Sequence, residues 1–239
     1  KDFKRAGKTL ARPLLDSPPS GIVRTGEAKD KEQTHMAIAF PGTTIGSDDS
    51  YALRVMSEIL SGQGGRLFIN LRDRLSLAYS VSAVEREGAD PGIFGVYIAS
   101  APDKKGQALT ALLKELEEIR TNPVTSDELN RAQRSLIGSY EIGLQEVSSQ
   151  ASDMANNELY GLGYGFSKEY PGKIEAVTVE DVLRIARKYI TLDSYVVSIV
   201  GPNGNMADPE PKPLKSIGGP FGPPLHETAP IPDAPYFIS

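Results

Sequence analysis

The chain has 239 residues, of which 39% are hydrophobic and 24% are charged, and its formal net charge is -5. This balance is typical of a folded protein that can bury its own core without disulfides or metal, and its acidity argues against nucleic acid as the partner, because phosphate binding needs a basic face. The absence of cysteine excludes disulfides, thiol catalysis and thiolate metal sites, and no apolar run approaches the ~20 residues needed to span a bilayer.

Composition divides the chain into a linker or entry arm, a folded domain and a tail, predicted over residues 1–33, 34–202 and 203–239. The entry arm is polar and broken by prolines, with one edge strand predicted near Gly21–Thr25. The tail holds ten of the 18 prolines, counting from Pro202, so we expect an extended segment without helix or ladder. The chain begins at Lys1 without a signal-peptide pattern, which indicates a processed product or a piece of a longer protein.

The folded domain is predicted to begin with a strand and two helices. Residues 34–40 alternate in side-chain size, which is the period of a strand. Residues 47–50 offer N-cap oxygens and negative charge for a helix that extends to about Leu60, with apolar residues at helical spacing. The glycine-rich turn at 62–65 ends that helix, and a second short helix with one apolar side is predicted over 67–75.

A hairpin, four helices and a closing strand follow. The predicted strands cover residues 77–85, 93–99 and 194–200, and the predicted helices cover 104–120, 126–144, 149–160 and 179–189. Asp103 is the predicted cap of the first of these helices, while Thr125 with Glu128 and Thr178 with Asp181 match capping boxes. Strands and helices are segregated along the chain. The predicted fold class is therefore α+β with two layers, a mostly antiparallel sheet covered by helices on one face.

Residues for metal binding or nucleophilic catalysis are sparse. His35 and His226 are the two histidines, and neither belongs to a His-Glu-x-x-His or His-x-x-Glu-His motif, whereas catalytic zinc sites usually take two or three histidines. We therefore interpret His35 as a strand histidine with local hydrogen bonds. A Gly-x-Ser-x-Gly elbow is absent. The glycine-rich turn lacks the Lys-Ser/Thr end of a phosphate loop, so it is interpreted as a helix-to-helix turn, with anion binding beside Arg66 as the alternative.

Arg72 and Tyr79 are the candidate functional residues, on either side of a predicted helix-to-strand turn. A guanidinium is a fixed fork of donors and a phenol is a donor on a stiff arm. Together they could bind a peptide carbonyl or stabilise an oxyanion formed by chemistry supplied elsewhere. The alternative is that Arg72 pairs with Asp73 or another nearby acid and that Tyr79 is an ordinary strand aromatic.

The stretch around these two residues resembles a known family. From Gly65 to Val81 the chain reads Gly-Arg-Leu-Phe-x-x-Leu-Arg-x-x-x-x-Leu-Ala-Tyr-Ser-Val, similar to the second-half motif of the insulinase-like (pitrilysin, M16) zinc metallopeptidases. That family includes mitochondrial processing peptidases and many bacterial homologues. Further pieces stand in the family's order: Gln33-x-His35 with Pro41-Gly42, Asp90-x-Gly92-x-Phe94, Pro123 to Leu129, Val177 to Val182 and Val196 to Pro202. The resemblance covers roughly residues 20–202.

The resemblance implies the C-terminal, metal-free half of such a peptidase. Family members pair two homologous α+β halves, one of which carries zinc on a His-x-x-Glu-His motif and hydrolyses peptide bonds. The other half supplies an arginine and a tyrosine that bind the substrate backbone and support the transition state, and these map onto Arg72 and Tyr79. The implied partners are a zinc-carrying half, in the same parent chain or a separate subunit, and a peptide or protein substrate that adds as a strand to a sheet edge.

This chain alone is therefore expected to be inactive, with the zinc in the partner half and no cofactor of its own. A homodimer is compatible with the same resemblance. The alternative function is a non-catalytic scaffold or peptide-binding subunit of the same fold, as in the family's respiratory-complex core proteins. The compartment stays open between the bacterial periplasm and the cytoplasm.

Overall fold

The computed structural model describes residues 17–62 and 64–202, so the first part of the entry arm, the proline-rich tail and His226 lie outside the described residues. The elements follow in the order β1 (Val23–Ala28), β2 (Thr34–Pro41), α1 (Asp49–Ser61), the π-helix η1 (Phe68–Arg74), β3 (Ser80–Arg86), β4 (Ile93–Ser100), α2 (Lys105–Thr121), α3 (Ser126–Gly143), α4 (Val147–Leu159), α5 (Tyr170–Glu175), α6 (Val179–Tyr189) and β5 (Val196–Gly201). Short 3-10 turns at Pro102–Lys104 and Phe166–Lys168 stand before α2 and α5.

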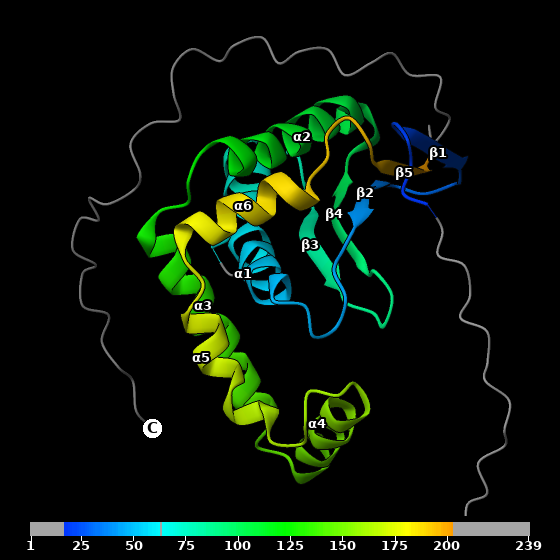
Figure 1. Ribbon diagram of the computed structural model, residues 1–239. Helices are drawn as coiled ribbons and strands as arrows, with labels where there is room; N and C mark the ends of the chain where they lie inside the picture. The colour runs from blue at the N-terminus through cyan, green and yellow to red at the C-terminus, as the bar shows by residue number, and fades with distance from the viewer. Residues whose placement is uncertain (1–16, 63, 203–239) are drawn as a thin grey trace, which may run out of the picture.

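The five strands form one sheet in the order β1-β5-β2-β4-β3 (Figure 1). The central strand β2 pairs antiparallel with β4 and β5, and β3 pairs antiparallel with β4 at one edge. At the other edge β1 runs parallel to β5, so part of the predicted entry arm belongs to the sheet. In register, Met36 lies opposite Ile98 and Ile199, and all three are buried. The predicted mostly antiparallel sheet is confirmed.

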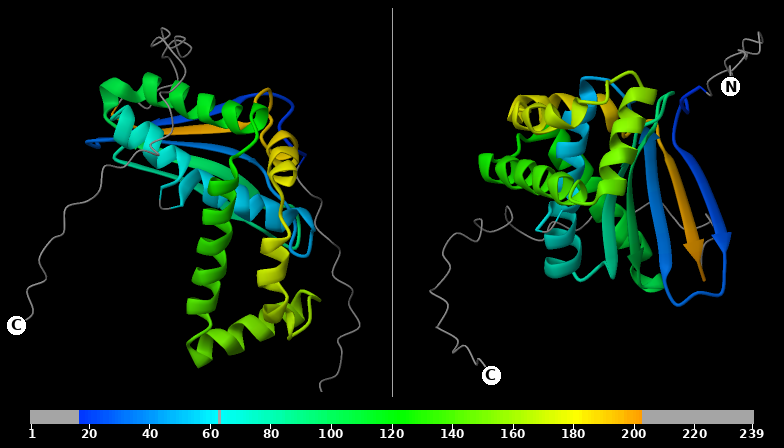
Figure 2. Two further views of the ribbon diagram at one scale, coloured as in Figure 1. Left: turned by 90° about the vertical axis from the view of Figure 1, so that its left-hand side faces the viewer. Right: turned by 90° about the horizontal axis from the view of Figure 1, so that it is seen from below.

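Helices cover one face of this sheet, as the right-hand view of Figure 2 shows. α1 supplies the centre of the core, because Ala52, Val55, Met56 and Ile59 recur at helical spacing and all are buried. The opposite face combines small side chains, such as those of Ala37, Ser82 and Ser198, with the larger side chains of His35 and Tyr97. The two-layer arrangement predicted from the sequence is thus the observed one. No helix among residues 17–62 and 64–202 is both long and apolar enough to cross a membrane.

Both predicted capping boxes are formed. The Thr125 hydroxyl accepts from the backbone N–H of Glu128 at 3.2 Å, and the Glu128 carboxylate accepts from the N–H of Thr125 at 2.8 Å. Thr178 and Asp181 repeat the arrangement at the start of α6. The predicted Asp103 cap is wrong. A 3-10 turn containing Asp103 stands there instead, and Lys104 is the N-cap of α2 without a side-chain hydrogen bond.

Three local predictions differ from the structure. The short helix is a π-helix, in which Leu75 N–H donates to the carbonyl of Asn70 at 3.1 Å. The strand predicted from Leu77 begins at Ser80, because the turn that follows the π-helix occupies the residues between. The helix α5 is absent from the sequence prediction, since Pro171 lies inside it. Proline is tolerated there because the first helical turn has no intrahelical use for its N–H.

Three helices form an arm that projects from the sheet-and-helix body (Figure 2, left). α3 and α5 run side by side, and α4 lies across their far end. The Gln133 side-chain amide ties α3 to the end of α5 and the residues after it by donating to the carbonyls of Ile174 and Val177, each at 3.0 Å. The rings of Tyr140 and Tyr170 add a contact with centroids 4.2 Å apart. We call α3, α4 and α5 the arm.

Candidate functional site

The segment that carries Arg72 and Tyr79 begins at a glycine turn after α1. Gly64 has a φ of +76°, a backbone conformation that suits glycine. A Cβ on Gly65 would lie 2.7 Å from the carbonyl oxygen of Leu60, so a side chain does not fit there. Leu67 and Leu71 then anchor the segment, because both are fully buried against the core. The turn and the two leucines fix where the opposite, solvent-facing side of the π-helix lies.

The turn between the two candidate residues has a strained backbone and is held by hydrogen bonds. Ser76 has a φ of +51°, a left-handed conformation that costs a non-glycine residue about 1–3 kcal/mol. Leu77 N–H donates to the carbonyl of Leu71 at 2.8 Å, and the Lys104 ammonium donates to the carbonyl of Ser76 at 3.1 Å. π-helical and strained segments are frequent at functional sites. Here Arg72 belongs to the π-helix itself, and the strained Ser76 lies between Arg72 and Tyr79.

Arg72 is exposed near the end of the π-helix. Its guanidinium carbon lies 4.7 Å from the centre of the Phe68 ring, a cation–π contact that restrains the side chain without using its N–H donors. Within the part of the chain that the structure describes, Arg72 forms no ion pair, so the alternative pairing with Asp73 is not seen there. The guanidinium is free to meet a ligand.

Tyr79 lies one residue before β3, and its side chain is 59% exposed. Its backbone N–H donates to the carbonyl of Ala99 at 2.8 Å, so the main chain is already fixed to β4. A phenol on a fixed backbone is a directed donor at little entropic cost. The structure therefore places both sequence-predicted residues at the surface of one anchored segment.

A hydrogen-bonded pair between the segment and α2, Asn70 with the buried Glu115, was not predicted. The Asn70 amide donates to the Glu115 carboxylate at 3.0 Å, and its oxygen accepts from Arg74 at 3.2 Å. Glu115 is 4% exposed, and burial raises the pKa of this carboxyl, although the bond from Asn70 opposes the rise. The one sequence signal was the position of Glu115 within the apolar stripe of α2, where a carboxylate needs a partner.

Arg66 is committed to a structural role. Its guanidinium binds both oxygens of Glu128, at 2.6 and 2.9 Å. Burial acts to raise the pKa of Glu128, but the bonds from Arg66 and Thr125 outweigh it and lower the pKa to about 2. Because the Arg66 guanidinium already binds the Glu128 carboxylate, it is not available to bind an anion at the glycine-rich turn. The pair joins the candidate segment to the first turn of α3.

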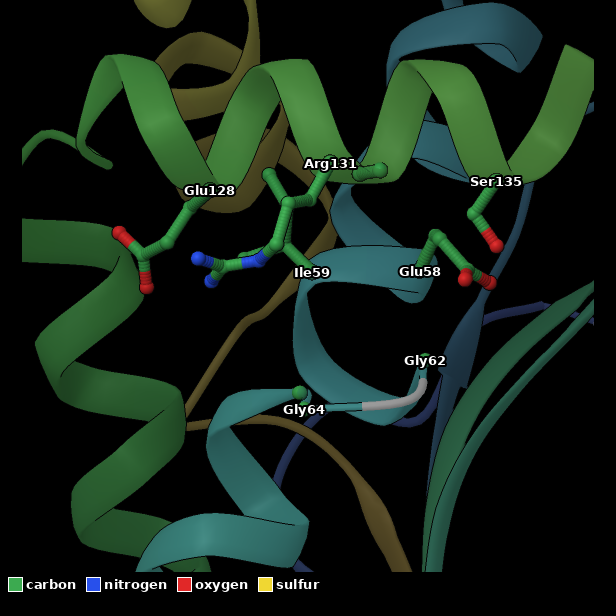
Figure 3. Close-up of a pocket in the computed structure, with 9 residues that line it drawn as sticks. Glu58, Ile59, Gly62, Gly64, Glu128, Arg131 and Ser135 are labelled. Carbon is green, nitrogen blue, oxygen red and sulfur yellow. The ribbon is translucent and has the colours of Figure 1, made fainter. Parts of the chain in front are cut away.

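A small pocket lies between the end of α1 and α3 (Figure 3). Glu58 and Ser135 stand together at one end, and Arg131 and Glu128 stand at the other. The pocket offers about 30 Å³, room for roughly one or two waters. We assign this pocket no ligand.

Metal binding finds no support among the described side chains. They contain no group of three or more His, Asp or Glu residues that could hold a metal ion. The His35 ring nitrogen Nδ1 lies 2.6 Å from the Tyr97 hydroxyl, which confirms the interpretation of a strand histidine with a local hydrogen bond. The donor set of residues 17–62 and 64–202 therefore does not fit a catalytic zinc.

Comparison with known proteins matches this geometry to one family. A family model described as the peptidase M16 inactive domain matches residues 1–136. The uncharacterized zinc protease YmxG of Bacillus subtilis (strain 168) is 28% identical over 193 residues, covering 80% of this chain and 47% of its own length. An uncharacterized zinc protease of Mycobacterium tuberculosis (strain ATCC 25618 / H37Rv) is 31% identical over 182 residues, or 74% of this chain and 41% of that protein.

Solved structures show the same fold. The peptidase M16 inactive domain from Pseudomonas fluorescens has a TM-score of 0.73 and 23% identity, over 82% of this chain and 47% of that one. A chain of Complex III2 from Candida albicans has a TM-score of 0.66 and 20% identity, over 76% and 46%. The chain spans about half the length of these two relatives and of these two structures. Its motif, its fold and the matched family model agree, and the chain belongs to the M16 peptidase family as one of its inactive domains.

Proposed function

We propose that this chain binds the backbone of a substrate peptide and supplies Arg72 and Tyr79 to a zinc site carried by a partner half. The observation that carries this proposal is the exposure of both side chains on one anchored segment, with Arg72 free of ion pairs among the described residues. Relatives named zinc proteases are more than twice as long as the region they share with this chain. The zinc-carrying half would occupy that additional length or a separate subunit.

The chemistry assigned to the two residues is donation to a carbonyl oxygen. The Arg72 fork is held over the Phe68 ring and keeps its N–H groups for a ligand. The Tyr79 hydroxyl offers one further donor. Donors that are already oriented when negative charge develops on a peptide oxygen stabilise the transition state more than the ground state. The chain would orient substrate in this way and would have no peptidase activity without its partner.

The test uses the two halves produced together, with cleavage of a peptide substrate as the readout. Arg72→Ala and Tyr79→Phe are each expected to lower kcat/KM by roughly 10²-fold, the usual effect of removing one transition-state donor. The matched control for the arginine is Arg134→Ala, which alters an exposed arginine elsewhere and should leave cleavage unchanged. Equal cleavage by the variants and the unmodified pair would show that the assigned roles are wrong.

A scaffold without catalysis is the second candidate. The observation that favours it is the arm, on which six large apolar side chains are exposed between positions 142 and 164. The same experiment separates the two functions, because a scaffold subunit would assemble with its partner but tolerate the loss of both donors. An assembled complex without cleavage of any peptide would favour the scaffold.

A further inference from the structure

Large apolar side chains are concentrated at the far end of the arm. Of the eleven exposed large apolar residues among those described, six lie between positions 142 and 164. The four most exposed of all are Ile142 at 67%, Val147 at 78%, Leu159 at 76% and Tyr164 at 70%. Scattered apolar residues are normal on a surface, but their concentration in one short stretch of the chain is typical of an interaction site. We call residues 142–164 the arm tip.

Within the arm tip, the polar side of α4 faces the protein and its apolar side faces solvent. Its one buried residue is Asn157, whose amide donates to Asp153 at 2.8 Å. Asp153 also accepts from the Tyr140 hydroxyl at 3.0 Å, so the contacts of α4 with α3 are polar. Val147, Met154 and Leu159 meanwhile face solvent. A 13-residue helix gains most of its stability by burying an apolar side, and this helix turns that side outward.

The arm tip is acidic as well as apolar. Between Arg134 and Lys168 the chain contains no lysine, arginine or histidine. The same stretch holds four acidic residues: Glu141, Glu146, Asp153 and Glu158. The three glutamates are exposed. Such a surface suits a partner face that is apolar with a basic rim, because opposite charges steer association and like charges oppose it.

The length of the relatives indicates what covers this surface. The matched region is only 41–47% of the curated relatives, so each has additional chain longer than the shared part. The arm tip projects away from the sheet and its covering helices (Figure 2, left), where none of the described residues of this chain covers it. We propose that the arm tip is the docking surface for the zinc-carrying half. This inference rests on the proposed function and adds the surface through which the two halves assemble.

The test measures association of two separately produced polypeptides, this chain and the zinc-carrying half of its parent protein. Val147→Gln with Leu159→Gln is expected to raise Kd at least about a hundredfold, since burial of each side chain contributes roughly tenfold. The variant should keep its circular dichroism and urea midpoint, because neither side chain packs in the core. The matched control is Ile22→Gln with Val23→Gln, the exposed apolar residue before β1 and the first residue of β1, and its Kd should not change.

Two further measurements locate the contact. Hydrogen exchange of amides 142–164 should slow in the complex relative to the chain alone. Glu146→Gln with Glu158→Gln should lower the association rate several-fold at low ionic strength, and the difference should fade in high salt.

Three outcomes decide between the possibilities. Unchanged Kd for the Val147/Leu159 variant would overturn the docking surface. A dimer of the isolated chain that this variant dissociates would show that a second copy covers the arm tip, which also overturns the proposal. Failure of the proposed function looks different, because the halves would then associate normally through the arm tip while Arg72→Ala and Tyr79→Phe leave cleavage unchanged.

Discussion

Asp49 joins the start of α1 to the last helix through three side chains. Its carboxylate accepts from Arg184 at 2.7 Å, from Tyr189 at 3.0 Å and from Lys188. Burial acts to raise the pKa of Asp49, but the bonds from Lys188, Arg184 and Tyr189 outweigh it and lower the pKa to about 2. The folded state thus keeps this carboxylate ionised at pH values where the unfolded chain would protonate it.

This network makes a pH-dependent contribution to stability. Because the folded pKa lies below the ordinary value of 3.8, the contribution is present above about pH 4 and is lost as the pH falls towards 2. Asp49→Asn should lower the free energy of unfolding by about 1–2 kcal/mol at pH 7, after allowance for solvent screening of the exposed cations. Urea unfolding at pH 7 and pH 3 should show this difference shrinking in acid. A difference that stays constant with pH would contradict the network.

At the scale of elements, the π-helix and its turn depend on contacts from outside the segment. Lys104 precedes α2, and its ammonium holds the carbonyl of the strained Ser76. Lys104→Met keeps most of the side chain but removes the donor. In the assembled pair we expect kcat to fall roughly tenfold with little change in KM, because small displacements of orienting groups are costly.

Two comparisons separate a positioning role for Lys104 from general damage. Lys104→Arg retains a donor and should restore most of the activity. The urea midpoint of Lys104→Met should stay close to that of the unmodified chain, since an exposed single bond contributes little. An unaltered kcat in Lys104→Met would mean that the turn holds its shape without the lysine.

Elements with local signals could be predicted from the sequence. α3 and α6 begin where their capping boxes predict, because the signal and the structure involve the same four residues. The π-helix could not be predicted, since apolar spacing at Leu67 and Leu71 suits an α-helix equally well and its i to i−5 bonds arise from tertiary packing. α5 was hidden by Pro171. The candidate pair was proposed from the resemblance, and its role stays a prediction, whereas Glu115 and Lys104 act through contacts distant in sequence.

At the scale of the whole molecule, the described part of the chain buries one apolar core but leaves large apolar side chains exposed. One face of the sheet is packed against helices, and the arm turns apolar side chains outward. Metal-binding side chains are not gathered at any place among residues 17–62 and 64–202.

Zinc should accordingly leave the isolated chain unchanged. A ligand that binds the folded state raises its melting temperature by mass action, so a chain without a site should show no shift. We expect the same Tm with excess Zn²⁺ and with EDTA, and no peptide cleavage in either condition. Thermal unfolding followed by circular dichroism checks the first expectation. A zinc-dependent rise in Tm would reveal a metal site that the described residues do not contain.

The Glu128 carboxylate makes two kinds of contact. It completes the capping box of α3, and it accepts hydrogen bonds from Arg66 at the start of the candidate segment. The stretch from Gly65 to Val81 is not expected to keep its geometry in another protein, because that geometry depends on the first turn of α3 and on Glu115 and Lys104. A graft of the Arg72–Tyr79 pair onto another scaffold would have to transplant those distant supports together with the motif.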